Sequence, residues 1–243
     1  MLAIYKKELI GFFSSLTGYI VIGVFLIITG LFMWLFTDTS VLEYSYASLD
    51  TLFYLGPVLF TFLIPSITMK SFSEERQKQT LELLFTKPLS NTQIILGKYL
   101  AYLTLVFFAV LLTLVYYFSI YQLGAPKGNI DSGAVLGSYI GLLLLGAVFV
   151  SIGVFSSALT KNQVVAFIIA IMLSFLIHWG FDFISKLPVF WGVWDDFIQK
   201  FGIDYHYKSI SKGLIDTKDL IYFVSVIIVF LLLTDFVLKK RKY

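Results

Sequence analysis

The chain has 243 residues, of which 58% are hydrophobic and only 14% are charged, and its formal net charge is +3. A soluble domain needs a charged shell over its core, so this composition excludes an ordinary soluble domain and predicts a membrane domain. There is no cysteine, which excludes disulfides, thiol nucleophiles and thiolate metal sites.

Six apolar runs are long enough to cross a membrane, since about 30 Å of hydrocarbon requires about 20 helical residues. The second run contains Pro57 and Pro65, which predict a kink. The sequence therefore predicts an all-α bundle of six transmembrane helices that forms a single domain over 1–243. The runs cover residues 16–36, 51–69, 99–121, 135–159, 164–185 and 220–238.

Residues 1–15 predict an amphipathic helix ahead of the first span. Tyr5 and Phe12 belong to a set of apolar residues at helical spacing, while Lys6 and Lys7 cluster away from most of that set. Such a helix would place its apolar face at the acyl boundary and its lysines among anionic lipid headgroups. The alternative is a frayed extension of the first span.

Residues 70–98, between the second and third spans, have the composition of a soluble helix. Ser73, followed by Glu74 and Glu75, predicts a helix start, and Pro88 predicts its end. A helix of this composition can dock against another protein. Leu81, Leu84 and Phe85 would form its apolar side. Arg76, Lys78 and Glu82 would form its polar side.

The positive residues fall mainly on one side of the predicted bundle. The loop with Asp38, Glu43 and Asp50, on the other side, has no Lys or Arg. Because positively charged loops stay in the cytoplasm, both termini are expected to be cytoplasmic. This side holds twelve of the 18 Lys and Arg residues: 6, 7, 70, 76, 78, 87, 98, 161 and 239–242.

Residues 186–219 are expected to lie outside the cytoplasm. An aromatic stripe over 187–201 is interrupted by Asp195, Asp196 and Lys200, so it is too polar to cross lipid. Because Trp and Tyr favour the headgroup zone, the stripe predicts a horizontal or re-entrant helix in the outer interface. A cap packed on the bundle is the alternative.

The fourth and fifth spans carry two further candidate features. Gly137 and Gly141 have the small-x-x-x-small spacing that lets helices approach closely, either within the bundle or between two subunits. His178 and Asp182 are four residues apart and would share a face of the fifth helix. Intramembrane ionisable residues are functional candidates, although a packing role is the alternative. No metal-binding motif accompanies this pair.

The segment between the second and third spans resembles a known family. Glu74-Glu75-Arg76, Thr80-Leu81-Glu82-Leu83-Leu84 and Pro88-Leu89-Ser90 match the pattern E-x-x-x-G/T-T-L-E-x-L-x-x-x-P of ABC-2 type permeases. The N-terminal helix, the six spans and the helical break before the last span extend the resemblance over nearly the whole chain. Within the family, the chain is most similar to the permease subunit associated with bacterial gliding motility.

The resemblance implies the permease subunit of an ABC exporter in the bacterial inner membrane, paired with a second copy or a sister permease. A separate ATP-binding subunit would hold ATP and magnesium. Its groove would receive the N-terminal helix and the coupling residues Glu74, Glu75, Arg76, Thr80, Leu81 and Glu82.

This chain itself lacks the phosphate-binding loop G-x-x-x-x-G-K-[ST], because Gly97-Lys98 is followed by Tyr99. No cofactor and no catalytic residue are therefore expected in it. No nucleic-acid partner is expected either, since the basic residues lie where topology requires them.

Three alternatives remain open from the sequence. The energy of ATP could be passed to an envelope machine without transport. A membrane-embedded enzyme would use His178, Asp182 and His206 as its polar centre. A secondary transporter would carry paired polar residues near the midplane or inverted repeats with broken helices, and neither is clear.

Overall fold

The computed structural model describes residues 1–240 with gaps at 44–45, 86–87, 191, 193 and 214–215, and it does not describe the side chains of Leu83 and Phe85. Within the described residues, six helical segments are long and apolar enough to cross a membrane. They confirm the predicted number and order of spans, at Leu16–Trp34, Asp50–Gln77, Asn91–Leu123, Ser132–Leu159, Gln163–Ser185 and Thr217–Lys240.

Three of the six spans consist of more than one helical element. The first is α2 (Leu16–Trp34), the second α3 (Asp50–Thr68) with α4 (Ser73–Gln77), and the third α6 (Asn91–Leu112) with α7 (Leu114–Leu123). The fourth is α8 (Ser132–Leu159), and the fifth is α9 (Gln163–Phe175) continued by the π-helix η1 (Leu176–Gly180) and α10 (Phe181–Ser185). The sixth is α13 (Thr217–Lys240). The remaining elements are α1 (Leu2–Phe13), α5 (Leu81–Phe85), η2 (Pro188–Phe190), α11 (Asp195–Gln199) and α12 (Ile203–Ile210).

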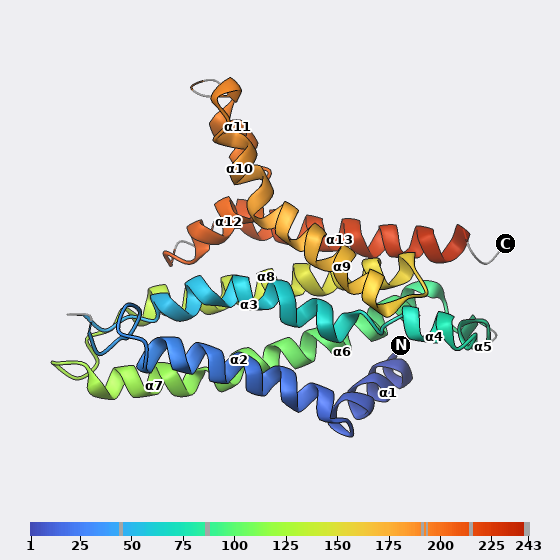
Figure 1. Ribbon diagram of the computed structural model, residues 1–243, viewed down its shortest axis with the longest axis horizontal. Coiled ribbons are helices and arrows are strands. Elements are labelled where there is room, and N and C mark those ends of the chain that lie inside the picture. Colours follow the sequence, from blue (N-terminus) through green and yellow to red (C-terminus); the bar gives the residue numbers. More distant parts are fainter. Residues whose placement is uncertain (44–45, 86–87, 191, 193, 214–215, 241–243) are drawn as a thin grey trace.

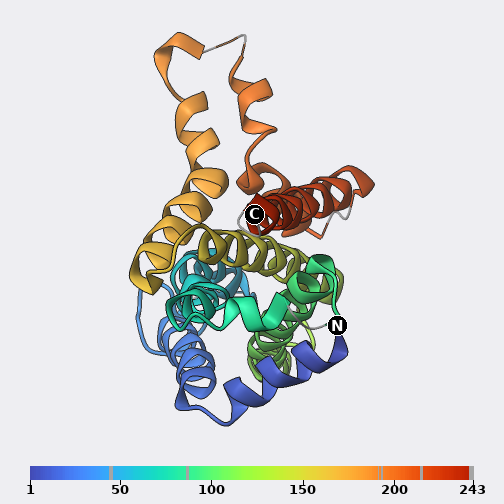
Figure 2. The ribbon, with the colours of Figure 1, turned by 90° about the vertical axis from the view of Figure 1, so that its right-hand side faces the viewer.

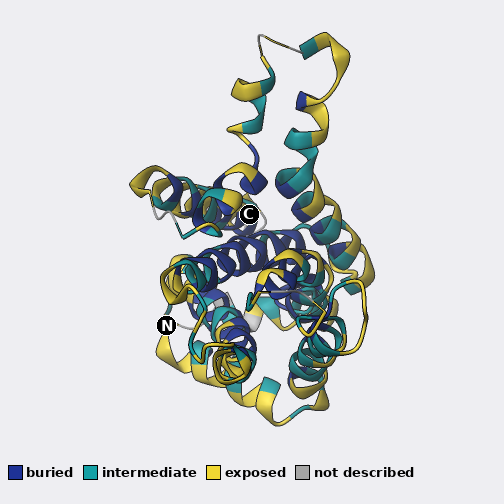
Figure 3. Ribbon diagram, turned by 90° about the vertical axis from the view of Figure 1, so that its left-hand side faces the viewer, coloured by how far each residue is buried: buried dark blue, intermediate teal, exposed yellow. Residues whose placement is uncertain are grey.

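Helix α8 is the centre of the bundle and packs against α3, α6, α9 and α13 (Figure 3). Its most apolar stretch is 78% buried, against 22% for those of the first, fifth and sixth spans. Small residues let its neighbours approach, because a Cβ on Gly146 would lie 2.7 Å from the Val106 side chain. The apolar face of α8 therefore meets protein rather than lipid.

The two prolines of α3 do not end the helix, which continues from Asp50 to Thr68. Proline has no N–H, so Pro57 leaves the carbonyl oxygen of Phe53 without its usual helical donor. The Tyr207 hydroxyl of α12 donates to that oxygen at 2.8 Å. The proline thus provides the acceptor that fixes α12 to the start of α3.

The ends of the bundle differ in structure. Figure 1 shows α1, α4, α5 and the end of α13 at one end, here called the Lys98 end. The connections after α2 and after α7 lie at the opposite end, which is also where Tyr207 attaches α12. Figure 2 shows α1 lying across the Lys98 end, transverse to the spans. A turn at Ser14 and Ser15 separates α1 from α2, so α1 is a distinct helix rather than a frayed extension.

Helices α10 and α11 project sideways from the bundle (Figures 1 and 2). Trp194, Phe197 and Phe201 on this arm are each more than half exposed. The alternative of a packed aromatic cap is therefore wrong. The chain returns through α12, which packs against α8 and α13.

Candidate functional site

Lys98 occupies the second turn of α6, a helix with a well-defined start. The Ser90 hydroxyl accepts a hydrogen bond from the Gln93 backbone N–H, while the Gln93 side chain accepts one from the Ser90 N–H. This capping box fixes where the helix begins and hence which face Lys98 occupies. The Lys98 side chain is only 2% exposed.

The Lys98 ammonium joins three parts of the chain. It donates to Glu8 Oε1 of α1 at 2.8 Å, to Glu75 Oε1 of α4 at 3.0 Å and to the Ser71 carbonyl oxygen at 2.6 Å. It also lies 5.1 Å from the centre of the Phe72 ring. An ammonium has three donors, and all three are used here. The sequence grouped Lys98 with the charges that set topology and missed this role.

A second lysine extends these contacts into a network. Lys7 Nζ lies 3.3 Å from Glu75 Oε1, so positive and negative groups alternate through Lys7, Glu75, Lys98 and Glu8. We call these four residues, with the Ser71 carbonyl, the Lys98 network. Glu75 Oε2 is buried and has no hydrogen-bond partner among the described residues.

Helix α1 packs on α6 through its apolar residues. Gly97 permits the approach, because a Cβ there would lie 3.0 Å from the Met1 carbonyl oxygen and 3.1 Å from Ile4 Cβ. The Tyr5 hydroxyl lies 3.1 Å from Thr104 Oγ1, and the Phe12 and Tyr102 rings are 5.0 Å apart at their centres.

These contacts leave Tyr5 and Phe12 half-buried, so the prediction that this face lies at the acyl boundary stays a prediction. Of the two lysines, Lys6 is exposed and Lys7 reaches Glu75.

Helix α4 is attached to the ends of α8 and α9. Arg76 Nη1 donates to the Ala158 carbonyl oxygen at 3.1 Å, and the Phe72 N–H donates to Ser157 Oγ at 3.3 Å. A guanidinium at the C-terminal end of α8 also interacts favourably with the helix dipole. The Gln77 and Gln163 side chains are 3.5 Å apart. Helix α4 thus contacts the fourth and fifth spans, in addition to its contact with the third span through Glu75 and Lys98.

The predicted single helix after Ser73 is wrong, because two short helices, α4 and α5, occupy this segment. Gln79 between them has a φ of 55°, the left-handed conformation that breaks a helix. It stands where the family pattern has Gly or Thr. Ser73 is not the predicted cap either, since its hydroxyl donates to the Met69 carbonyl oxygen.

The remaining predicted coupling residues lie at the surface of this segment. Glu74 pairs with Lys78 at 2.6 Å, and Thr80 and Glu82 are exposed. Leu81 is half-buried against the core, as is Leu84, whereas the side chain of Phe85 lies outside the described residues. The segment presents exposed polar groups over partly buried leucines.

Replacing Gln79 with glycine is expected to stabilise this turn by about 1 kcal/mol, since a non-glycine residue in the left-handed region costs about 1–2 kcal/mol. Hydrogen exchange of the backbone amides over 78–84 measures the change and should slow about fivefold. Gln77→Gly is the matched control. Gln77 lies inside α4, so glycine there should speed exchange. Faster exchange in Gln79→Gly would contradict the left-handed turn.

A polar cavity of about 460 Å³ opens between α1 and α4. Its charged lining comes from the Lys98 network together with Lys70, Glu74 and Lys78. Both signs of charge are therefore presented in a concave surface at the Lys98 end, which suits recognition of a charged protein surface.

The candidate residues His178 and Asp182 line one groove, and Asp182 and His206 line the cavity beside it, but each of the three has a different partner. His178 is buried with Asp204 as its nearest charged group, at 4.0 Å, whereas Asp182 forms an ion pair with Lys186 at 2.6 Å. His206 interacts separately with Asp219 at 2.7 Å. The three groups of the enzyme alternative thus have separate partners.

Gly137 and Gly141 both face the α12 region of the same chain. A Cβ on Gly137 would lie 2.9 Å from Gly213 Cα, and one on Gly141 would lie 3.1 Å from Ile210 Cγ2. Both glycines therefore permit close packing inside the bundle. The contact with the α12 region covers the face of α8 that was also a candidate for contact with a second subunit.

A family model described as ABC-2 family transporter protein matches residues 2–188, which include α1, the Lys98 network and the first five spans. A search of curated proteins found no match.

Proposed function

Because this chain belongs to the ABC-2 family of transporter proteins and is a multi-pass membrane protein, we propose that it couples ATP hydrolysis by a separate subunit to transport across the membrane. The observation that carries this proposal is the Lys98 network. It ties the two elements that the family resemblance assigns to ATPase docking, α1 and the α4–α5 segment, to the base of a membrane span.

The network provides a physical route for coupling. A displacement of α4 would be transmitted to α6 through the ion pair of Glu75 with Lys98, and from Lys98 to α1 through Glu8. It would be transmitted to α8 through Arg76. Ion pairs that are largely removed from water hold their partners at fixed distances more firmly than exposed pairs do. Closure of an attached ATPase would therefore move several spans together instead of bending one loop.

The wider proposal follows the family resemblance. It places the protein in a bacterial inner membrane with both termini cytoplasmic, as a dimer with itself or a sister permease. It assigns outward transport, in support of gliding motility, with ATP and magnesium held by the partner subunit. The Lys98 end then faces the cytoplasm, in agreement with the distribution of positive residues.

The test is capture of the tagged protein from its native membranes in mild detergent, with identification of co-purifying proteins. An ATP-binding subunit that carries a G-x-x-x-x-G-K-[ST] loop should accompany the wild type. Leu81→Asp and Glu82→Lys should reduce its recovery at least about tenfold, because a few anchor residues dominate most interfaces. These positions leave the Lys98 network intact.

Glu43→Lys is the matched control, since this exposed glutamate lies in the connection between α2 and α3, at the opposite end of the bundle. It should retain the ATPase fully. Absence of any ATP-binding subunit, or its full retention by the Leu81 and Glu82 variants, would reject docking through this segment.

A further inference from the structure

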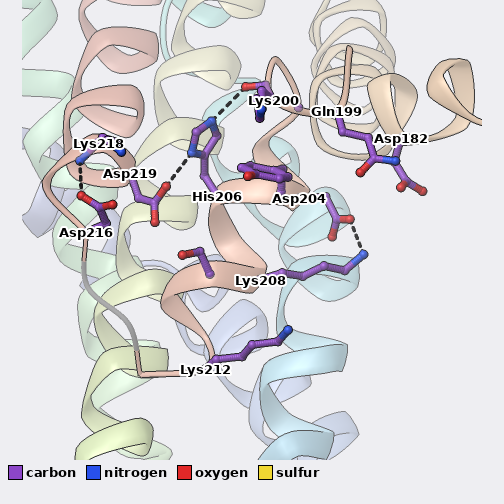
Figure 4. Close-up of a pocket in the computed structure, with 13 residues that line it drawn as sticks. Asp182, Gln199, Lys200, Asp204, His206, Lys208, Lys212, Asp216, Lys218 and Asp219 are labelled. Atoms are coloured by element: carbon purple, nitrogen blue, oxygen red, sulfur yellow. Dashed lines mark hydrogen bonds and ion pairs between the residues drawn. The ribbon is translucent and has the colours of Figure 1, made fainter. Parts of the chain in front are cut away.

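His206 of α12 lies where α12, α13 and the end of the α10–α11 arm meet (Figure 4). Its Nε2 atom lies 2.9 Å from the Lys200 carbonyl oxygen at the end of α11, and its Nδ1 atom lies 2.7 Å from Asp219 Oδ1 in α13. The Tyr222 ring of α13 stacks on the imidazole, with 3.9 Å between the ring centres and 21° between the planes. One side chain thus joins three elements.

Both ring nitrogens of His206 face acceptor atoms. A carbonyl oxygen can only accept, so Nε2 must carry a hydrogen to bond to Lys200. An ionised carboxylate also only accepts, so the contact between Nδ1 and Asp219 Oδ1 needs a second proton. A neutral imidazole has one N–H, and beside an ionised Asp219 it can make only one of the two contacts. The geometry therefore requires one extra proton, held by the pair of His206 and Asp219.

The surroundings of the pair favour an imidazolium beside a carboxylate. Asp219 lies in the first turn of α13, where the helix dipole stabilises a negative charge. The face of the stacked Tyr222 ring attracts a cation. Asp219 Oδ2 is buried and has no hydrogen-bond partner among the described residues. The ion pair with His206 is thus the contact that compensates this buried carboxylate.

The other titratable groups around the pair are exposed to water, set apart from it or already paired. Asp216 and Lys218 are exposed, and Figure 4 shows Lys212 apart from His206. The Tyr205 ring lies at 83° to the imidazole, with 5.3 Å between the centres. The neighbouring ion pairs are those of Asp204 with Lys208 at 2.5 Å, Asp182 with Lys186 at 2.6 Å and Lys200 with Asp196 at 3.6 Å.

A polar cavity of about 830 Å³ gives protons access to the pair. Both residues line it, and their side chains are 11% and 7% exposed, for His206 and Asp219 respectively. The cavity lies beside α12, which Tyr207 attaches to the end of the bundle opposite the Lys98 network. The pair can therefore exchange its proton with water at that end.

Loss of the proton breaks the contact between His206 and the arm. A charged carboxylate is a stronger acceptor than a carbonyl, so the remaining N–H stays on Nδ1 with Asp219. Nε2 then presents a lone pair to the Lys200 carbonyl oxygen, which repels it. The hydrogen bond from the Tyr222 hydroxyl to the Phe201 carbonyl oxygen, at 2.6 Å, is not affected by this change. The end of the arm is therefore held less firmly to α13 once the proton is lost.

We propose that the proton shared by His206 and Asp219 is a pH-dependent latch that fixes the end of the arm to α13. The latch is closed while the proton is bound and opens as the pH rises. This inference does not rest on coupling to an ATPase, because it concerns the isolated chain and the end of the bundle remote from the Lys98 network.

The experiment measures hydrogen exchange of backbone amides 200–202 in the purified full chain in detergent, at about pH 5 and about pH 8, on either side of the usual titration of histidine. These amides donate to the carbonyl oxygens of Asp196, Ile198 and Gln199 at the end of α11. Each rate is compared with that of an unstructured chain at the same pH, which gives the protection of the amide. Protection in the wild type should fall at least about fivefold at the higher pH, the effect of losing one hydrogen bond.

Two variants separate a proton-dependent latch from a fixed contact. In Asp219→Asn, the amide N–H can donate to Nδ1 of a neutral His206 while Nε2–H still donates to Lys200. Protection should therefore be high and equal at both pH values. His206→Phe keeps a ring on Tyr222 but has no nitrogen, so protection should be low at both pH values.

Amides 128–130, in the connection between α7 and α8, are the internal control, because they form hydrogen bonds in a turn that contains no histidine. Their protection should be the same at both pH values. Equal protection of amides 200–202 in the wild type at the two pH values would overturn the proposal, as would a pH dependence that persists in Asp219→Asn. Full protection in a folded, monodisperse His206→Phe variant would overturn it too, because the arm would then be held without the imidazole.

Discussion

Replacing Lys98 with methionine is expected to lower the free energy of unfolding by about 3–5 kcal/mol, the usual effect of removing one partner from a buried ion pair. Glu8 and Glu75 have side chains only 15% and 14% exposed, so both would retain a poorly solvated charge, and only Glu75 would keep a partner, the exposed Lys7. The Ser71 carbonyl oxygen would also lose its donor. The melting temperature of the detergent-solubilised protein measures this, and a fall of about 10 °C is expected.

The control for this prediction is a charge-neutral network. The triple variant Lys98→Met/Glu8→Gln/Glu75→Gln removes the uncompensated charges. Replacing all members of a buried ion pair with uncharged side chains often changes the free energy of unfolding little. It should recover most of the lost melting temperature. Lys6→Met, on the exposed face of α1, should change stability by less than about 0.5 kcal/mol. A triple variant no more stable than Lys98→Met would mean that unpaired charge is not the cause.

Coupling provides a second readout for the same variants. If the Lys98 network transmits motion, the triple variant should bind the ATP-binding subunit yet lose ATP-dependent activity, because α5 and Leu81 remain while the link from α4 to α6 is broken. Normal activity in a stable triple variant would confine the network to a structural role.

The six spans were predictable because lipid imposes a length on every helix that crosses it. A continuous apolar run of about 20 residues can form few stable structures other than a membrane-spanning helix, so local composition is enough to predict these helices. Only the ends of the spans differ between the prediction and the structure. The third span, for example, begins at Asn91 rather than at residue 99, because the capping box at Ser90 starts the helix before the apolar run.

The Lys98 network was not predictable, because its partners are distant in the sequence. Lys98 is 90 residues from Glu8 and 23 from Glu75. A lysine within an apolar helix must find a partner or extend to water, which marks the position as unusual. Nothing in the spacing identifies Glu8 or Glu75, whose pairing depends on how α1 and α4 pack on α6.

The coupling segment shows how tertiary contacts override local preference. Gln79 is a good helix former, so the sequence favours one helix across it. Arg76 is held by the end of α8, and Leu81 packs on the core, and these attachments require a turn between them. The exposed polar face was therefore predictable, whereas its division into α4 and α5 was not.

Replacing Gly153 with alanine is the second change with a large expected effect. Its Cβ would lie 2.0 Å from Thr68 Oγ1 and 2.7 Å from Thr68 Cβ, so α3 and α8 would have to separate. Thr68 cannot easily turn away, because it is β-branched and its hydroxyl donates to the Ile64 carbonyl oxygen at 2.8 Å. Overpacking of this kind should lower stability by about 1–3 kcal/mol, at the upper end here.

Gly23→Ala is the matched control, since Gly23 also lies inside a membrane span but has open space where a Cβ would be. Alanine there should stabilise the helix by about 0.5–1 kcal/mol. Melting temperatures of the two variants should therefore shift in opposite directions. Adding Thr68→Ala to Gly153→Ala removes the 2.0 Å contact but keeps the one at 2.7 Å, so it should recover only part of the loss.

Gly153 lies close to the contacts that hold α4, so its replacement should also affect how α4 is attached to the bundle. Thr68 lies three residues before Ser71, whose carbonyl oxygen binds Lys98, and α4 follows directly. Separating α3 from α8 therefore also strains the bond between Arg76 and Ala158 that holds α4 to α8. Gly153→Ala should reduce co-purification of the proposed ATP-binding subunit even though Gly153 itself is buried. Full co-purification with a lowered melting temperature would show that α4 keeps its position independently of the contact between α3 and α8.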